Sequence, residues 1–231
     1  MSKSIAIMGA PGAGSTSIAA TLASFIAQHG ETSVMLVLCD AVLPPKSYLC
    51  KLQNAESIGE QMVEAGELHE ARLLRAVEPI TDYFGVMGYN TGDRRTAFPA
   101  PTPGGVEKWC RAVSTLADVV LYDIGSAVEN TLANYLLNNA DDVVTVLSAD
   151  VKSAAWHKHI GNSLRSDLQV INAVRKGQPL DLFQDFATAS FIVPYSSELE
   201  ADFQTLQLFD PIQERHYKTA LETLFGRLIQ T

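Results

Sequence analysis

A glycine-rich segment between an apolar run and a helical pattern constrains this chain more than any other feature. Ser4–Met8 is a short apolar run that predicts a buried strand, and Gly9–Gly14 interrupts it. Apolar residues then recur at helical spacing over Thr16–His29, and Gly30 is a stop signal. A second buried strand is expected at Val34–Leu38. Strand, glycine turn, helix and strand together form a βαβ unit, the building block of a parallel sheet.

The alternation of strand and helix patterns continues to the end of the chain, without a linker or a repeat. It predicts one α/β domain over residues 1–231, with a doubly wound, mainly parallel sheet of about seven strands and helices on both faces. Further strands are expected at Tyr83–Met87, Asp118–Tyr122, Asp142–Leu147, Leu168–Asn172 and Ser190–Val193. Helices are expected at Ser57–Ala65, Glu70–Ala76, Val106–Leu116, Val128–Leu137, Ser153–Leu164, Ser197–Leu206 and Pro211–Gln230, and a surface loop at Gly88–Gly105.

The glycine-rich segment has the spacing of a phosphate-binding loop but lacks its lysine. Gly9-Ala10-Pro11-Gly12-Ala13-Gly14-Ser15-Thr16 reads G-x-x-x-x-G-x-T, whereas a nucleotide-binding P-loop reads G-x-x-x-x-G-K-[ST]. In such loops backbone N–H groups cradle phosphates at a helix N-terminus. Ser15 stands at the lysine position, and Thr16 stands where a Mg²⁺-binding hydroxyl is expected. A tight strand-to-helix turn without a ligand is the alternative interpretation.

This loop resembles that of the ParA/MinD family of ATPases, whose deviant P-loop reads K-G-G-x-G-K-[ST]-[ST]. Ala10 falls at the position of the family's first lysine and Ser15 at that of the second, while Thr16 and Ser17 match the paired hydroxyl residues. Pro11 replaces one glycine. The resemblance implies a nucleotide site over residues 9–17 from which both of the family's lysines are missing.

Other segments resemble the same family in the same order along the chain. Asp40 matches the first aspartate of its D-x-D motif, and Val42 replaces the second, which helps to position the attacking water. Asp123 ends a strand that resembles the Walker B strand, while Asn172 and Pro194 lie in segments similar to those near the adenine base. The resemblance implies ATP or ADP with Mg²⁺ as the cofactor, bound weakly or not at all, and a metal site made of Thr16, Asp40 and Asp123.

The missing lysines determine the expected function. Each lost charge-assisted hydrogen bond costs about 1.5–3 kcal/mol, so ATP binding should be roughly two to four orders of magnitude weaker if nothing replaces them. With Val42 also unable to orient water, efficient hydrolysis is not expected. The resemblance then implies a pseudo-ATPase that organises or localises a bacterial assembly as a homodimer with an unidentified protein partner. The TadZ branch of the family is one candidate for the subfamily that it resembles.

Two other functions remain open from the sequence. In one, the protein is an active ATP-dependent dimerisation switch in which Arg94, Arg95 or Lys108 replaces the missing lysines. In the other, the glycines form a Rossmann-type turn with Asp40 on a ribose, as in a dinucleotide-binding oxidoreductase. The Y-x-x-x-K motif of short-chain dehydrogenases does not occur in the chain.

Charge and composition limit the partners. Seventeen basic and 26 acidic residues give a formal charge of −9, which argues against broad binding to nucleic acid or anionic membrane. The two adjacent basic pairs, Arg94–Arg95 and Arg175–Lys176, are interpreted as solvated loop charges. The chain has three cysteines without a C-x-x-C spacing, no signal-peptide pattern and no transmembrane run, which predicts a cytoplasmic protein.

Several helical residues are assigned structural roles. His157 and His159 are expected to be exposed because residues two apart point to different faces of a helix. Trp109 and Trp156 are expected to be partly buried. The C-terminal helix lacks a polybasic face, so we expect it to pack against the sheet rather than on a membrane.

Overall fold

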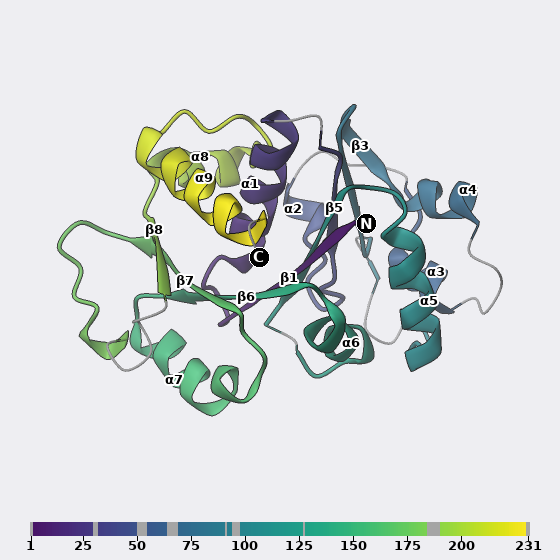
Figure 1. The fold of residues 1–231 in the computed structure, drawn as a ribbon, viewed down its shortest axis with the longest axis horizontal. Helices are drawn as coiled ribbons and strands as arrows, with labels where there is room; N and C mark the ends of the chain where they lie inside the picture. Colours follow the sequence, from purple (N-terminus) through teal and green to yellow (C-terminus); the bar gives the residue numbers. More distant parts are fainter. Residues whose placement is uncertain are drawn as a thin grey trace.

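An eight-stranded sheet forms the centre of the molecule (Figure 1). The computed structural model describes residues 2–29, 32–49, 55–63, 69–90, 92–93, 98–126, 128–183 and 190–229. The strand order is β3-β4-β2-β5-β1-β6-β7-β8, and every neighbouring pair is parallel except β3 with β4. The strands are β1 (Lys3–Gly9), β2 (Val34–Leu38), β3 (Glu78–Thr81), β4 (Phe84–Gly88), β5 (Val119–Gly125), β6 (Asp142–Ser148), β7 (Leu168–Val174) and β8 (Ser190–Pro194).

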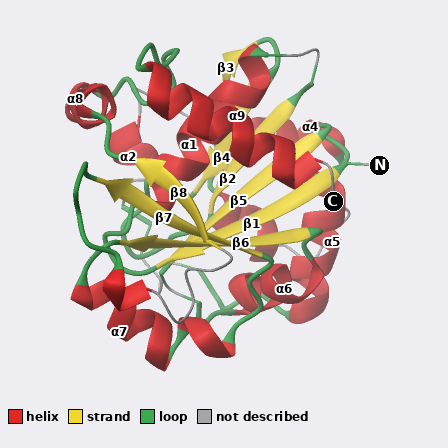
Figure 2. Ribbon diagram, turned by 60° about the vertical axis from the view of Figure 1, so that its left-hand side comes forward, coloured by secondary structure: helices red, strands yellow, loops and turns green. Residues whose placement is uncertain are grey.

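Helices cover both faces of this sheet (Figure 2). Helices α1, α8 and α9 lie on one face, and α5, α6 and α7 lie on the other (Figures 1 and 2). The helices are α1 (Ser15–Gln28), α2 (Lys46–Leu49), α3 (Ile58–Val63), α4 (Glu70–Leu73), α5 (Pro103–Val113), α6 (Thr131–Asn139), α7 (Val151–His159), α8 (Ser197–Thr205) and α9 (Arg215–Ile229), with short 3₁₀ turns at Leu74–Ala76, Gly161–Ser163 and Asp181–Phe183. Because both faces are covered, the central strands are mostly apolar, and residues 5–8 of β1 have no exposed surface.

The C-terminal helix packs as expected from the sequence. Helix α9 contacts α1 and β8, and it buries Tyr217, Leu221, Leu224 and Leu228. Its contact with α1 is partly polar, since the hydroxyl oxygens of Thr21 and Tyr217 lie 3.2 Å apart in the interior. Next to it, the Ser24 hydroxyl of α1 donates to the Phe209 carbonyl at 2.7 Å. Among the described helices, none has both the length and the hydropathy of a bilayer-spanning segment.

The eight-stranded sheet agrees with the expectation of about seven strands, with one strand added. The additional strand, β3, pairs antiparallel with β4 at the edge of the sheet, with Pro79 opposite Gly85. Proline lacks a backbone donor and is tolerated in an edge strand, and its presence concealed this strand in the sequence. The short helix α2 lies where a loop was expected after Pro44. The proposed substitute cations Arg94 and Arg95 lie outside the described residues.

The prediction of exposed histidines is correct for His159 and wrong for His157. The His157 side chain is 4% exposed, because Ser153, Trp156 and His157 form the face of α7 that packs toward the sheet. Its Nε2 lies 3.1 Å from Nε2 of Gln169 on β7, and burial lowers the pKa of the imidazole. The tryptophans are more deeply buried than expected, since Trp109 is fully buried and donates to Gln61 at 3.1 Å, and Trp156 is 8% exposed.

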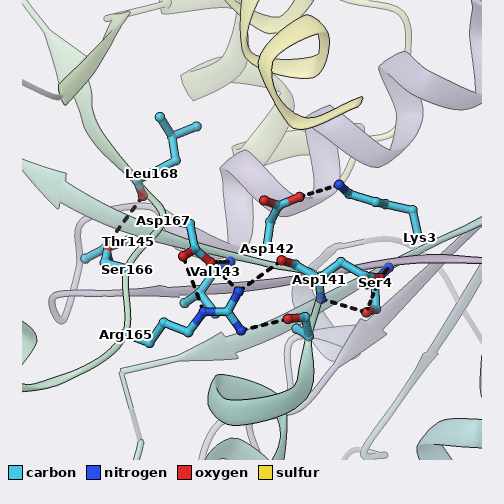
Figure 3. Close-up of polar contacts among 11 residues, drawn as sticks. Lys3, Ser4, Asp141, Asp142, Val143, Thr145, Arg165, Ser166, Asp167 and Leu168 are labelled. Carbon is cyan, nitrogen blue, oxygen red and sulfur yellow. Dashed lines mark hydrogen bonds and ion pairs between the residues drawn. The ribbon is translucent and has the colours of Figure 1, made fainter. Parts of the chain in front are cut away.

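Aspartates at the starts of three strands hold the amino-terminal edge of the sheet together, and Figure 3 shows two of them, Asp141 and Asp167. The Asp141 carboxylate accepts from both the backbone N–H and the hydroxyl of Ser4 at 2.7 Å, and the Asp141 N–H donates back to the Ser4 hydroxyl at 3.0 Å. Asp118 makes the same reciprocal contact with Ser33. Asp167 accepts from the Val143 N–H at 2.9 Å. These contacts join β1 to β6, β2 to β5 and β6 to β7, and so fix the register of the parallel strands.

We expect Asp141→Ala to lower the free energy of unfolding by about 1–2 kcal/mol, because it removes the acceptor for two Ser4 donors. Urea denaturation of the purified protein measures this. Glu222→Ala on the exposed face of α9 is the control and should change stability by less than about 0.5 kcal/mol. Equal free energies of unfolding for the two variants would show that the contact between Asp141 and Ser4 does not stabilise the fold.

Candidate nucleotide site

The glycine-rich segment forms a compact loop between β1 and α1, at the carboxyl edge of the sheet. Gly12 and Gly14 both have positive φ, 79° and 85°. A side chain at Gly14 would also collide with Asn172, since a Cβ there would lie 2.5 Å from Asn172 Nδ2. Gly9 approaches β6 so closely that a Cβ would lie 2.6 Å from the Val146 carbonyl oxygen. Glycine is therefore required at both ends of the loop.

The first turn of α1 presents free backbone donors beside this loop. Gly14 is the N-cap residue and no side chain caps the helix; the first intrahelical bond runs from the Ile18 N–H to the Gly14 carbonyl. Within the described residues, the N–H groups of Ser15, Thr16 and Ser17 donate to no protein acceptor. Such a set of donors at the positive end of a helix suits an anion.

Thr16, Asp123 and Asp40 lie close together at the base of the loop. The Thr16 hydroxyl donates to Asp123 Oδ2 at 2.6 Å, and the Gly125 N–H donates to Asp123 Oδ1 at 3.2 Å. Asp40 lies across from Gly125, where a Cβ would be 3.7 Å from Asp40 Oδ2. Its other oxygen accepts from the Val42 N–H at 2.7 Å. Two carboxylates and a hydroxyl are hard oxygen ligands, so these residues fit Mg²⁺.

Electrostatics at Asp123 also indicate a site suited to a cation. The side chain is fully buried. Burial raises the pKa of Asp123 to about 6, hydrogen bonds from Thr16 and Gly125 lower it in part, and the charge of Asp40 raises it further. No basic side chain of the described residues contributes to this balance. A carboxylate in these surroundings gains a compensating charge when a divalent cation binds.

Tyr48 on α2 is a residue of this site that the sequence did not reveal. Burial raises the pKa of its phenol to about 12, and the charges of Asp123 and Asp40 raise it further, while an interaction with the Thr16 hydroxyl lowers it. The phenol is therefore a neutral hydrogen-bond donor among the metal-site residues at pH 7. Its ring also meets Phe203 of α8 edge-on, with the centroids 5.9 Å apart. The proline pair before α2 was interpreted as a loop, so no helical signal pointed to Tyr48.

The residues expected near a base lie at the ends of the next two strands. Asn172 of β7 is buried, and its side-chain amide donates to the Ala13 carbonyl of the loop at 2.9 Å. Pro194 ends β8 and pairs with Val174 of β7. The structure thus brings Asn172 into direct contact with the loop, and it places Pro194 at the same edge of the sheet.

The proposed substitute Lys108 is not part of this arrangement. It is exposed on α5, a helix that packs against α3, α4 and α6. Lys46 lies nearer in sequence to the site, but it is buried and donates to Asn90 Oδ1 at 2.8 Å. The Val42 side chain, at the position of the second aspartate, is 69% exposed and apolar.

Solved structures of similar fold are ATPases of the ParA and MinD type. A ParA family ATPase from Chlorobium tepidum TLS superposes with a TM-score of 0.78 at 13% identity, covering 97% of this chain and 98% of that one. A plasmid partition protein from Borrelia burgdorferi B31 bound to AMPPNP gives 0.71 at 14%, covering 100% and 99%. The cell division ATPase MinD from Pyrococcus furiosus gives 0.73 at 12%, covering 98% and 100%.

No protein-family model and no curated protein sequence matches the chain. The structural similarity shows that the chain has the α/β fold of the ParA/MinD P-loop ATPases over nearly its whole length. It gives no support to the dinucleotide-binding oxidoreductase considered from the sequence.

Ionisation of Asp123 should destabilise the protein without Mg²⁺ or nucleotide. Because its pKa is about 6 in the folded protein and about 3.9 when unfolded, folding stability falls as the pH rises between these values. The cost reaches at most about 3 kcal/mol above pH 6. Asp123→Asn cannot ionise, so its stability relative to wild type should increase from pH 4 to pH 8 in thermal or urea unfolding.

Asp118→Asn is the matched control, because hydrogen bonds from the Ser33 hydroxyl and N–H lower the pKa of Asp118. A lowered carboxyl pKa stabilises the fold at higher pH, so this variant should lose stability relative to wild type as the pH rises. The same pH dependence for wild type and Asp123→Asn would contradict the assignment of a raised pKa to Asp123.

Proposed function

We propose that this protein is a ParA/MinD-like nucleotide-binding protein with a degenerate phosphate loop. The observation that carries the proposal is the loop itself, in which free N–H groups at the start of α1 lie beside the Thr16–Asp123 contact. The ligand is ATP or ADP with Mg²⁺. When bound, the magnesium ion neutralises phosphate charge.

The residues of the site have distinct roles in this proposal. The loop backbone cradles the phosphates, and Thr16 with Asp123 and Asp40 holds the metal. Asn172 and Pro194 lie along the edge that the base would occupy. Asn172 also fixes the loop through the Ala13 carbonyl, so the loop is shaped before a ligand arrives. Such preorganisation supports binding in the absence of the two lysines.

Slow or absent hydrolysis follows from what the loop lacks. Ala10 and Ser15, at the lysine positions, are buried and uncharged. Loss of a preorganised charge on a transferring phosphoryl group costs about 10²–10³ in rate. Val42 presents an exposed apolar side chain and cannot accept a proton from water. We therefore infer a pseudo-ATPase that acts through the proteins it binds.

The carboxyl edge of the sheet supports association with a second copy. Val42 and Leu43 after β2 are 69% and 61% exposed, and Val151 after β6 is 71% exposed. Large apolar side chains in these exposed positions beside a ligand site are typical of a surface that a partner covers. We infer a homodimer across this edge, and an organising role in which the dimer localises a further bacterial protein assembly.

Restoring the second lysine should strengthen nucleotide binding. Ser15→Lys places an ammonium group at the start of α1, where one charge-assisted hydrogen bond to phosphate contributes about 1.5–3 kcal/mol. We expect the affinity for Mg²⁺-ATP to increase about 10- to 150-fold, measured by calorimetric titration. Thr223→Lys on the exposed face of α9 adds the same charge away from the loop and should leave the affinity within about twofold of wild type.

Equal affinities of the folded wild type and Ser15→Lys would contradict phosphate binding at this loop. Rapid Mg²⁺-dependent ATP turnover by the wild type would contradict the pseudo-ATPase assignment. Light scattering of the same samples tests the homodimer, since a monomer at all nucleotide concentrations would exclude it.

A further inference from the structure

A cavity beside the phosphate loop shares Asn172 with the nucleotide site proposed above, but its other lining residues have no role in that proposal. It has a volume of about 340 Å³, and its lining residues lie at the carboxyl ends of β6 and β7 and before the start of α7. Its polar lining comprises Ser148, Asp150, Asn172, Arg175, Lys176 and Gln178. This volume is at the lower end of the range for small-molecule sites.

The cavity is cationic in a chain whose overall charge is −9. Arg175 and Lys176 line it, and neither takes part in an ion pair within the described residues. Asp150 is the single carboxylate among the described lining residues, and both of its oxygens accept hydrogen bonds within the protein. It caps α7 by accepting from the Ser153 N–H at 2.8 Å, and it also accepts from the Ser148 hydroxyl at 2.5 Å.

The Arg175 side chain is held in place rather than free in solvent. Its guanidinium lies over the Tyr195 ring, 3.9 Å from the centroid. Its backbone N–H donates to Gln178 Oε1 at 3.0 Å, and the Gln178 amide in turn donates to the Ala149 carbonyl at 2.8 Å. These bonds join the segment after β7 to the end of β6 and so shape the wall of the cavity. A stacked guanidinium retains its edge for paired hydrogen bonds to an anion.

The backbone next to the cavity has an uncommon conformation. Ala173 has a φ of 55°, one of two positive values among the described non-glycine residues, and the β7–β8 register shifts between Ile171 and Val174. A left-handed alanine costs on the order of 1 kcal/mol and persists only where the surroundings require it. Here it accompanies the register shift, after which Val174 pairs again with Pro194 of β8 and Arg175 and Lys176 follow at the edge of the sheet.

We propose that this cavity binds the phosphate group of a small molecule through Arg175 and Lys176, at a site separate from the phosphate loop. Phosphate suits the donors present, because the other polar side chains are occupied within the protein and only the two cations remain to recognise a ligand. Asn172 lines the cavity and also bonds to the Ala13 carbonyl. A ligand in the cavity would therefore contact Asn172, the residue that shapes the loop.

Equilibrium dialysis of the full chain with inorganic phosphate, at fixed ionic strength, tests the proposal. Arg175→Gln combined with Lys176→Gln should weaken phosphate binding at least tenfold. The control combines Arg215→Gln with Lys158→Gln, two exposed residues, and changes the same residue types and the same net charge. It should remain within about twofold of wild type. Ser15→Asp places a negative charge in the phosphate loop and should leave phosphate binding at the cavity in place.

Each result separates this site from the nucleotide site. Loss of phosphate binding in Ser15→Asp but not in the Arg175/Lys176 variant would locate the ion at the loop and overturn the cavity proposal. Equal losses in the Arg175/Lys176 variant and the control would show only general charge attraction and would also overturn it. Phosphate binding that depends on Arg175 and Lys176, without any Mg²⁺-ATP binding, would support the cavity and contradict the proposed function.

Discussion

The placement of β1 between β5 and β6 is the constraint on which the rest of the structure depends. This strand is hydrogen-bonded on both edges and buried on both faces, so neither its register nor its direction can change without breaking the core. The glycine-rich loop continues directly from its last residue. Gly9 lies so close to the Val146 carbonyl that the loop starts from a fixed point on the neighbouring strand.

The aspartates at the two edges of the sheet differ in their interactions. At the amino edge, Asp118, Asp141 and Asp167 tie each strand to its neighbour through short local bonds. At the carboxyl edge, neither Asp40 nor Asp123 forms an ion pair within the part of the chain that the structure describes. The fold tolerates these two carboxylates without an ion pair because the amino edge and the core hold the strands in register.

The fold could be predicted from the sequence, because apolar strands, helical spacing and the glycine positions are visible without tertiary information. The predicted residues Thr16 and Asp123 lie in hydrogen-bond contact, and their role in holding a metal stays a prediction. Residues whose roles depend on distant contacts were not predictable. Tyr48 reaches the site from a segment without a helical signal, and His157 is buried because of how α7 is oriented. Pro79 obscured the edge strand β3. Arg175 and Lys176 are exposed, as the sequence indicated, but the stacking of Arg175 on Tyr195 and the cavity that both residues line depend on β6, β7 and β8 together.

The polar seam between α1 and α9 has a mechanical consequence. Helix α1 begins at the phosphate loop, and two turns later its buried hydroxyls bond to Tyr217 and to the Phe209 carbonyl. Directional bonds resist sliding in a way that purely apolar packing does not. These bonds therefore resist rotation of α1 relative to α9, and they hold the helix that begins at the glycine-rich loop against the C-terminal helix.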